Sequence, residues 1–377
     1  MRKGIFIGSS VHKWNDPRVL IKEAVSLSKK YDVELHIPAP FSHRNFQNVT
    51  IIGLPEWKRK SERFRVILYL LHHILRSSAK VVHLHDPELI PVGLFVTMVT
   101  PKKVIFDFHE EYANKIVKRD WIPSIFRKPL AFGYIMLERI ASRIFDGVIG
   151  VIEDQLDILR ENPNHAIVKN YPVVNGSLNQ HLKKGDSGSF RMVYLGDITR
   201  ERQIHRLIDV AGRLNRQHNI TLHLIGGIGD PDYPDTINRT IQKYNLDEKV
   251  HQHGYLSIDK AMEIVSQSDV GFLPLRHPKH FVRSLPVKLF DYMAAGIPVI
   301  MPEYPLSREV ILTHNCGLLV DSTDLEDITE KVEYLVLHDD ERKLMGSNGQ
   351  EAVLKHFSWQ SQEKNLFAIY DQVLSDN

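Results

Sequence analysis

The stretch FRMVYLGD at residues 190–197 is a short apolar run that ends in a small residue and an acid, which is typical of a buried strand. Similar runs follow it, separated by longer helical patterns: LHLIGG (222–227), KVHQHGYL (249–256), VGFLPL (270–275), PVIMPE (298–303) and GLLVD (317–321). This alternation is the pattern of βαβ units and predicts a doubly wound α/β domain.

The residues before 190 show the same alternation. Their strand-like runs are GIFIGSS (4–10), VELHIPA (33–39), VTIIGL (49–54), VVHLH (81–85), KVIFDFH (103–109) and GVIGVI (147–152). A polar segment rich in Gly, Asn and Ser at 169–189 separates the two series and reads as a linker. We therefore predict two Rossmann-like domains, residues 1–175 and 176–356, with a last helix at 357–374 that could pack on either. Open parallel sheets bind ligands at the carboxyl ends of their strands, so we expect a cleft between the two domains.

The composition indicates an ordered globular protein, with 43% hydrophobic and 25% charged residues. The single cysteine, Cys316, excludes an internal disulfide framework and suits a cytoplasmic protein. The longest apolar run, VILYLLHHIL (66–75), is too short and too polar to cross a bilayer, and we see no membrane anchor.

The segment SDVGFLPLRHPKHFVRSLPVKLFDYMAAGIPVIMP (268–302) is the most specific motif. It resembles the donor-binding signature of family 4 glycosyltransferases, which implies the GT-B fold of two Rossmann-like domains. Pro286 suits a first helical turn, so Lys288 would lie where helix N–H groups favour phosphate. The resemblance assigns Lys288 to the donor diphosphate and Asp291 to the ribose. Alternatively, the two residues form an ordinary surface ion pair three positions apart.

This motif departs from the family in its carboxylates. The family has two glutamates eight apart; Asp291 takes the place of the second, and Arg283 that of the first. Since some relatives carry a small polar residue in this loop, Ser284 is a candidate contact for the donor sugar.

The segment VYLGDITRERQIHRLIDV (193–210) resembles the Gly-Arg…Lys-Gly segment of the family, whose two cations clamp the diphosphate. Asp197 stands at the first Arg and would repel phosphate, whereas Arg202 and Gln203 replace Lys-Gly. Arg202 offers a bidentate guanidinium, and Arg200 could compensate for Asp197. Alternatively, these cations only solvate the start of a helix.

Two further positions are expected to line the donor pocket. Gly227 lies in the glycine-rich turn LHLIGGIGD (222–230), which would let a nucleotide approach the backbone closely. Tyr255 belongs to a segment that matches the family's base pocket and could flank the nucleobase. A half-buried aromatic residue at a strand end is the alternative.

On the N-terminal side, the loop in GSSVHKWNDPRVLIKEA (8–24) resembles the family's opening loop near the donor phosphates and the acceptor. We expect Ser10 to contact the diphosphate, and His12 and Lys13 to lie on the acceptor side. Asp16 and Arg18 are expected to cap and pin the following helix.

Two strand ends in this half carry histidines. His85 and Asp86 are expected to form a structural pair beneath the site; alternatively, they contact the substrate directly. His109 follows KVIFDF and matches the family histidine that reaches the donor sugar, so we take it as the catalytic residue. A structural histidine at a strand end is the alternative. A neutral imidazole can hydrogen-bond a sugar hydroxyl and steady developing charge without a metal.

The resemblance implies a retaining glycosyltransferase that uses a UDP- or GDP-sugar, needs no metal or other cofactor, and acts on a cell-surface polysaccharide, a glycolipid or another acceptor. No partnership with nucleic acid is expected. Two alternatives stay open: a GT-B nucleotide-sugar epimerase, and a nonenzymatic subunit that binds nucleotide sugars.

The charge distribution suggests a membrane surface as a further partner. Residues 1–170 contain 26 Lys and Arg against 18 Asp and Glu, a net +8. The segment EWKRKSERFRVILYLLHHILR (56–76) within them combines six cations with apolar residues and reads as a basic amphipathic helix. We expect a cytoplasmic protein that could bind the inner face of the membrane peripherally; alternatively, the apolar residues face the sheet.

Overall fold

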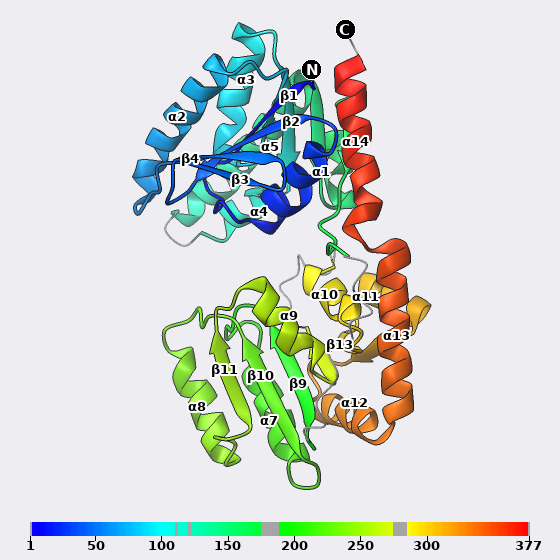
Figure 1. Ribbon diagram of the computed structural model, residues 1–377. Coiled ribbons are helices and arrows are strands. Elements are labelled where there is room, and N and C mark those ends of the chain that lie inside the picture. Colours follow the sequence, from blue (N-terminus) through cyan, green and yellow to red (C-terminus); the bar gives the residue numbers. More distant parts are fainter. Residues whose placement is uncertain (1, 110–111, 120–121, 175–187, 274–284, 376–377) are drawn as a thin grey trace. The chain divides into compact units, whose positions relative to one another are not determined.

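The computed structural model describes residues 2–109, 112–119, 122–174, 188–273 and 285–375. The chain divides into two compact units (Figure 1). Unit 1 comprises Met1–Asn170 and Trp359–Asn377, and unit 2 comprises Tyr171–Ser358. The division falls within the predicted linker at 169–189.

Unit 1 is built on an eight-stranded sheet with the order β3-β4-β2-β1-β5-β6-β7-β8. All its pairings are parallel except that of β3 with β4. The strands are β1 (Gly4–Gly8), β2 (Asp32–Pro38), β3 (His43–Phe46), β4 (Val49–Leu54), β5 (Val81–Leu84), β6 (Lys103–Phe108), β7 (Gly147–Gly150) and β8 (His165–Ile167). The six predicted strands are all present. The prediction missed β3 and β8, which are short and carry few apolar residues.

Helices of unit 1 connect these strands. They are the π-helical η1 (Pro17–Ala24), α1 (Val25–Ser28), α2 (Arg63–Arg76), α3 (Ile90–Val99), α4 (Tyr112–Val117), α5 (Ser124–Ile144), α6 (Leu156–Leu159) and α14 (Trp359–Ser375), with the 3-10 turns η2 (Lys60–Glu62), η3 (Pro87–Leu89) and η4 (Glu153–Gln155).

The last helix, α14, belongs to unit 1, although it follows unit 2 in the sequence (Figure 1). It packs against β7, β8 and η1. Its first residue, Trp359, is buried and donates its indole N–H to Ser26 Oγ at 2.8 Å. Near its other end, the buried Tyr370 hydroxyl lies 2.8 Å from His83 Nδ1. The helix therefore completes the interior of unit 1.

Unit 2 contains a six-stranded sheet, all parallel, with the order β11-β10-β9-β12-β13-β14. The strands are β9 (Phe190–Leu195), β10 (Ile220–Ile225), β11 (Val250–Gly254), β12 (Val270–Phe272), β13 (Val299–Pro302) and β14 (Gly317–Val320). The helices are α7 (His205–Leu214), α8 (Tyr233–Lys243), α9 (Ile258–Ser266), α10 (Val287–Ala294), α11 (Pro305–His314), α12 (Leu325–Leu337) and α13 (Asp339–His356). Each predicted strand of this half is present, and Cys316 is buried before β14.

The predicted basic amphipathic helix at 56–76 is shorter than expected. It begins with the 3-10 turn η2 at Lys60 and continues as α2 from Arg63 to Arg76. Val66, Leu70 and Ile74 recur every four residues and are buried in the core of unit 1. Phe64 and Leu68 lie on the exposed side, with exposed fractions of 64% and 50%. The helix thus has two apolar stripes, and only one of them faces the sheet. Among the described residues, no helix combines the length and the apolar character needed to span a bilayer.

Candidate functional site

The loop after β1 is held by one carboxylate at the end of the neighbouring strand. Asp86 Oδ2 accepts hydrogen bonds from Ser9 Oγ at 2.7 Å, from the Ser10 N–H at 2.5 Å and from the Val11 N–H at 3.2 Å. The Ser10 hydroxyl also lies 3.2 Å from Glu88 Oε1. Ser10, expected to bind the donor diphosphate, is fully buried and directs its donors to carboxylates. In this structure it supports the loop.

Two histidines meet above this loop. His12 Nε2 and His109 Nε2 lie 3.1 Å apart, although 97 residues separate them in the sequence. His12 Nδ1 faces Asp16 Oδ2 at 3.0 Å, and its Nε2 faces Asp86 Oδ1 at 3.4 Å. Carboxylates at both nitrogens favour the imidazolium form of His12. Lys13, the other residue expected on the acceptor side, is exposed.

Asp16 caps the helix as expected. Its Oδ1 accepts the N–H groups of Arg18 and Val19 at 2.8 and 3.0 Å. Burial would raise the pKa of Asp16, but the hydrogen bond and charge of His12 lower it to about 2. His12 is therefore paired with an ionised carboxylate at neutral pH.

His109 lies at the end of β6 and is nearly buried, with a side chain 10% exposed. Its Nδ1 is 3.3 Å from the Asp107 carbonyl oxygen. Burial lowers the pKa of His109, although the Asp107 carboxylate opposes the shift. A neutral His109 that donates from Nδ1 keeps its Nε2 as an acceptor toward His12.

A buried charge network lies behind His109. Arg18 donates to both oxygens of Asp107, with Nε to Oδ2 at 2.8 Å, and its Nε is 3.0 Å from Glu23 Oε1. Burial alone would raise the pKa of Asp107, but the Arg18 charge holds it well below its usual range. Burial raises the pKa of Glu23 to about 7 against the opposing charge of Arg18. Arg18 thus pins the helix to the sheet, as expected.

The sequence analysis missed Asp107, Glu23 and His83 in this network. It also paired His85 with Asp86, whereas His85 faces Glu23 and Asp107. Parallel pairing of Leu84 with Phe106 explains this, because the next position brings His85 beside Asp107. Alternate residues of a strand point to one face of the sheet. The patterns HxH at 83–85 and DxH at 107–109 could therefore have predicted that these side chains share a face.

A cavity of about 170 Å³ opens beside the end of β6 in unit 1. Its lining is mostly apolar: Phe108, Tyr112, Ala113, Asn114, Ile135, Glu138, Asp154, Gln155, Ile158 and Leu159. Burial raises the pKa of Glu138 to about 7, although a hydrogen bond with Tyr134 opposes the shift. This acid therefore retains its proton in mildly acidic solution and can donate a hydrogen bond.

In unit 2, Lys288 is the second residue of α10, whose N-terminal cap is Pro286. Its Nζ is 3.2 Å from Asp291 Oδ2. The predicted phosphate and ribose ligands thus form an ion pair in this structure. The buried Tyr292 of the same helix accepts the Leu195 N–H at 2.7 Å and donates to the Phe272 carbonyl at 3.1 Å, which fixes α10 to the ends of β9 and β12.

Arg202 follows β9 and is half-buried. Its Nη1 donates to the Asp197 carbonyl at 3.1 Å and to the Tyr194 hydroxyl at 3.3 Å, and its Nη2 is 3.6 Å from Asp197 Oδ2. Asp197 therefore orients Arg202 and offsets part of its charge. The next residue, Gln203, has φ 54°, in the left-handed region that favours glycine.

The other predicted donor contacts in unit 2 surround the same loop. The Arg200 N–H donates to Asp230 Oδ2 at 2.7 Å, and its guanidinium lies over the Tyr233 ring, 5.5 Å from the centroid. Tyr255 is 80% exposed, and its hydroxyl is 3.4 Å from Asp197 Oδ1.

The Tyr255 ring packs against Gly227, where a Cβ atom would lie 2.2 Å from it. A larger residue at 227 would therefore displace the exposed Tyr255 side chain. Ser284 and Arg283 lie outside the described residues.

Comparison with known proteins finds similarity to glycosyltransferases. Residues 179–352 match the model of "Glycosyl transferases group 1". The chain is 23% identical over 173 residues to MMP alpha-(1->4)-mannosyltransferase of Mycolicibacterium hassiacum, covering 46% of this chain but only 40% of that protein. It is 24% identical to the uncharacterized glycosyltransferase MJ1178 of Methanocaldococcus jannaschii over 92% of this chain and 91% of the relative.

A solved structure matches along the whole chain. HepE from Anabaena, in complex with UDP and glucose, has a TM-score of 0.69 at 12% identity and covers 100% of both chains. Such a likeness shows the fold. Residues 179–352, just under half of the chain, match the group 1 glycosyltransferases, the named relatives are glycosyltransferases, and the whole chain has the GT-B fold.

Proposed function

We propose that the chain transfers a sugar from a UDP- or GDP-linked donor to an acceptor with retention of anomeric configuration. One observation carries this proposal. Arg202 follows β9 and Lys288 begins the helix that follows β12, and these two strands are neighbours in the sheet. Two cations at adjacent strand ends of the family domain are suited to a diphosphate. The UDP complex of HepE favours a uridine donor.

The two cations share a further property that suits reversible binding. Each is already paired with a carboxylate of its own loop or helix, Arg202 with Asp197 and Lys288 with Asp291. These pairs hold the side chains in place while the donor is absent. A bound diphosphate would replace Asp197 and Asp291 as the partner of the two cations. Asp291 would then be able to accept hydrogen bonds from the ribose. Arg200 and Tyr255 would add a contact to phosphate and one to the base.

We assign His109 to the donor sugar. Its ring is neutral and fixed by Asp107, so it can exchange its contact with His12 for one with a sugar hydroxyl. His12 is held as an imidazolium by Asp16 and Asp86, and it supplies fixed positive charge beside His109. We propose that such fixed cations and helix N-termini stabilise the departing diphosphate without a metal in the reaction. The resemblance to family 4 supports retention.

We propose that the cavity beside β6 receives part of the acceptor. It begins at Phe108, the residue before His109, and its walls are mostly apolar. The neutral form of Glu138 offers a hydrogen-bond donor inside it. An acceptor with an apolar portion and an oxygen to accept that bond, such as a lipid-linked glycan, fits these walls.

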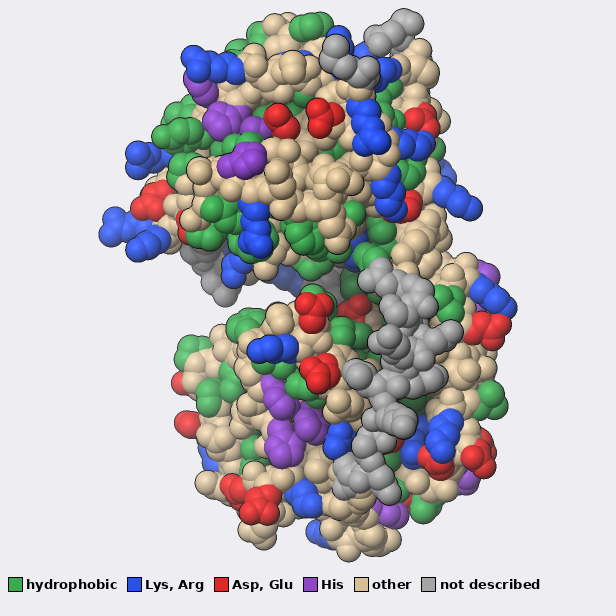
Figure 2. Space-filling model, in the orientation of Figure 1, with side chains coloured by type: hydrophobic (Ala, Val, Ile, Leu, Met, Phe, Trp, Pro, Cys, Tyr) green, Lys and Arg blue, Asp and Glu red, His purple; other side chains and the backbone are tan. Residues whose placement is uncertain are grey.

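We further propose that unit 1 binds an anionic membrane surface through α2. Phe64, Leu68 and Leu75 are exposed on this helix, beside the exposed cations Arg65 and Arg76. Figure 2 shows hydrophobic and basic side chains interspersed on the surface of unit 1. Trp57 and Arg63, included in the predicted docking segment, are instead tied to the protein: Arg63 lies 4.0 Å from the Trp57 ring centroid and pairs with Glu88. Such docking would place the enzyme at the inner face of the membrane.

The proposal is tested by supplying donors and following the product. A thermal-shift panel of UDP, GDP, ADP and their sugars identifies the donor, because a ligand that binds only the native state raises the melting temperature. Proton NMR of the product then gives the anomeric configuration, and chelator in the assay tests the need for a dissociable metal. An inverted product would refute retention. Free epimerised nucleotide sugar without acceptor would indicate the epimerase, and donor binding without transfer would indicate the binding subunit; the family match favours transfer over both.

A further inference from the structure

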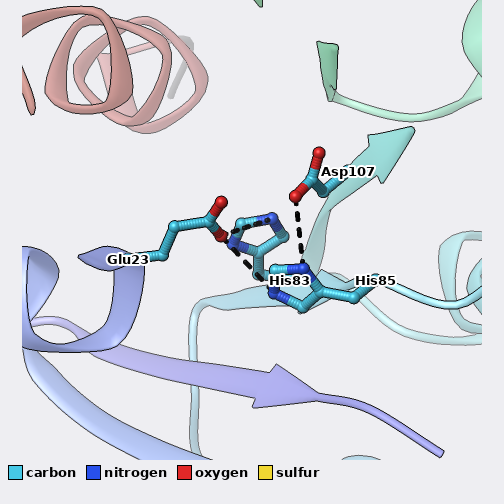
Figure 3. Close-up of side chains that lie close together, drawn as sticks. All are labelled: Glu23, His83, His85 and Asp107. Atoms are coloured by element: carbon cyan, nitrogen blue, oxygen red, sulfur yellow. Dashed lines mark ion pairs between the residues drawn. The ribbon is translucent and has the colours of Figure 1, made fainter. Parts of the chain in front are cut away.

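Four ionisable side chains meet in the interior of unit 1 (Figure 3). They are Glu23 from η1, His83 from β5, His85 just after β5, and Asp107 from β6, and none is more than 1% exposed. One donor atom from each lies within 4.8 Å of the donor atoms of the others. The group lies behind His109 and is not among the residues assigned to the donor or the acceptor.

Three atoms at the centre of this group lack a hydrogen-bond partner. They are Glu23 Oε2, His83 Nε2 and His85 Nε2, all shielded from solvent. A buried polar atom without a partner is costly, so three at one point are unusual in a native core. They converge, because Glu23 Oε2 is 3.8 Å from His83 Nε2 and 3.5 Å from His85 Nε2.

The other two ring nitrogens face groups behind the cluster, and only His83 Nδ1 has a hydrogen-bond partner. His83 Nδ1 is 2.8 Å from the Tyr370 hydroxyl, and His85 Nδ1 is 3.3 Å from Asp107 Oδ2. When Nδ1 of a neutral imidazole carries the proton, Nε2 presents its lone pair. A histidine held at one nitrogen by a carboxylate, with the other nitrogen toward a metal, is a recurring arrangement in zinc sites.

We propose that Glu23, His83 and His85 bind a zinc ion inside unit 1. Two imidazole nitrogens and one carboxylate oxygen are a ligand set that zinc accepts when a fourth ligand such as water completes the tetrahedron. At zinc–ligand distances of about 2.0 to 2.1 Å, tetrahedral geometry places ligand atoms about 3.4 Å apart. The two separations to Glu23 approach this value, so small movements of the side chains suffice.

The charges around the group leave room for a cation. Glu23 and Asp107 are two carboxylates, and within the described part of the chain Arg18 is the one guanidinium that contacts both. Arg18 approaches Glu23 through Oε1, whereas both histidines face Oε2. The guanidinium and the ion can therefore use different oxygens of Glu23.

The ion would have a structural role. Its ligands come from η1 and from β5 with the residue that follows it, and Tyr370 extends the group to α14. It would thus join the first helix, the centre of the sheet and the last helix of unit 1. This role differs from transfer chemistry, so the site can exist whether or not the proposed transfer is metal-independent.

The test is the metal content of the full-length chain, produced without a histidine tag in zinc-supplemented medium. Wild type, Glu23→Gln and His83→Gln are compared by inductively coupled plasma mass spectrometry after extensive dialysis. Unit 2 offers a matched control, because His223, His251 and His253 form a half-buried cluster with His223 Nδ1 3.0 Å from His253 Nε2. Figure 2 shows histidine side chains gathered on the surface of unit 2, where zinc could bind adventitiously. The control variant is His251→Gln/His253→Gln.

We expect about one zinc per wild-type chain, at least a fivefold loss in Glu23→Gln and in His83→Gln, and retention in the control variant. Zinc lost only in the control variant, or a wild-type chain that holds less than about a tenth of an equivalent, would overturn the proposal. X-ray absorption of the wild-type protein tests it without a variant that must fold. The spectrum should show imidazole and oxygen ligands only, with two imidazoles, and any other ligand set would contradict the assignment.

Discussion

His12 Nε2 and His109 Nε2 lie 3.1 Å apart, each delivered by a loop at the carboxyl end of a different strand. Carboxylates at both ring nitrogens of His12 favour its charged form, whereas burial lowers the pKa of His109 and favours its neutral form. The pair therefore combines a fixed cation with a hydrogen-bonding group that can turn to a sugar. This division separates charge stabilisation from sugar recognition.

For His109→Ala, we expect turnover to fall by about 100-fold or more, while UDP affinity changes little, because the imidazole is assigned to the sugar and not to the phosphates. Steady-state kinetics and calorimetry with UDP measure the two effects. His43→Ala, an exposed histidine on β3, serves as the control. Wild-type turnover in folded His109→Ala would remove His109 from the reaction centre.

For Lys288→Ala and Arg202→Ala, we expect weaker binding of the nucleoside diphosphate by about 10- to 100-fold each, since each loses a charge-assisted contact worth about 1.5 to 3 kcal/mol. Calorimetry measures the affinity, and circular dichroism confirms the fold. Arg216→Ala, an exposed cation of unit 2, should bind normally. The phosphate assignment fails if both variants keep wild-type affinity.

For Gln203→Gly, we expect a gain of about 1 kcal/mol in the free energy of unfolding of unit 2, because glycine relieves the cost of a left-handed backbone at φ 54°. Urea unfolding monitors the change. Gln217→Gly, at an exposed position that is not among those with positive φ, should instead lose up to about 1 kcal/mol. Equal losses in both variants would show that the backbone at 203 is not strained.

For Glu138→Gln, we expect stability to depend less on pH than in wild type. The folded pKa of Glu138, about 7, exceeds its ordinary value of 4.5, so the folded state binds the proton more tightly. The resulting stability is complete below pH 4.5 and is lost as pH rises through 7. Between pH 5 and 8, wild type should lose about 1 to 3 kcal/mol relative to the variant. Urea unfolding across this range decides, and parallel curves would contradict the assignment.

For membrane docking, we expect wild type to float with anionic vesicles in low salt and to remain behind at high salt, because each cation near anionic headgroups contributes about 1 kcal/mol. Reversal of Arg65 and Arg76, the exposed cations of α2, to glutamate should abolish flotation. A matched pair of reversals in unit 2, Arg216→Glu and Lys260→Glu, should not. Equal recovery with neutral and anionic vesicles would contradict the docking proposal, and α2 would then serve only to cover the core of unit 1.

The sequence predicted the strands that carry the site better than it predicted the contacts between them. The strands ending near Ser10, His85 and His109 all form, because buried parallel strands are apolar runs that stand out locally. Which strands lie side by side depends on the order of the sheet, and residues that meet across neighbouring strands are dozens of positions apart in the sequence. Asp107 looked like an ordinary strand residue, although it binds Arg18 and faces His85. Ser10 was predicted to contact the diphosphate, whereas its N–H and hydroxyl groups both donate to Asp86 Oδ2.

The return of α14 to unit 1 has a consequence for the order in which the protein can be built. Trp359 and Tyr370 fill the interior of unit 1 but are translated only after the whole of unit 2. While the ribosome is still extending the chain, unit 2 can fold as a continuous segment, whereas unit 1 must wait with the positions opposite Ser26 and His83 uncovered. The interior of unit 1 can therefore be completed only after all of unit 2 has been synthesised.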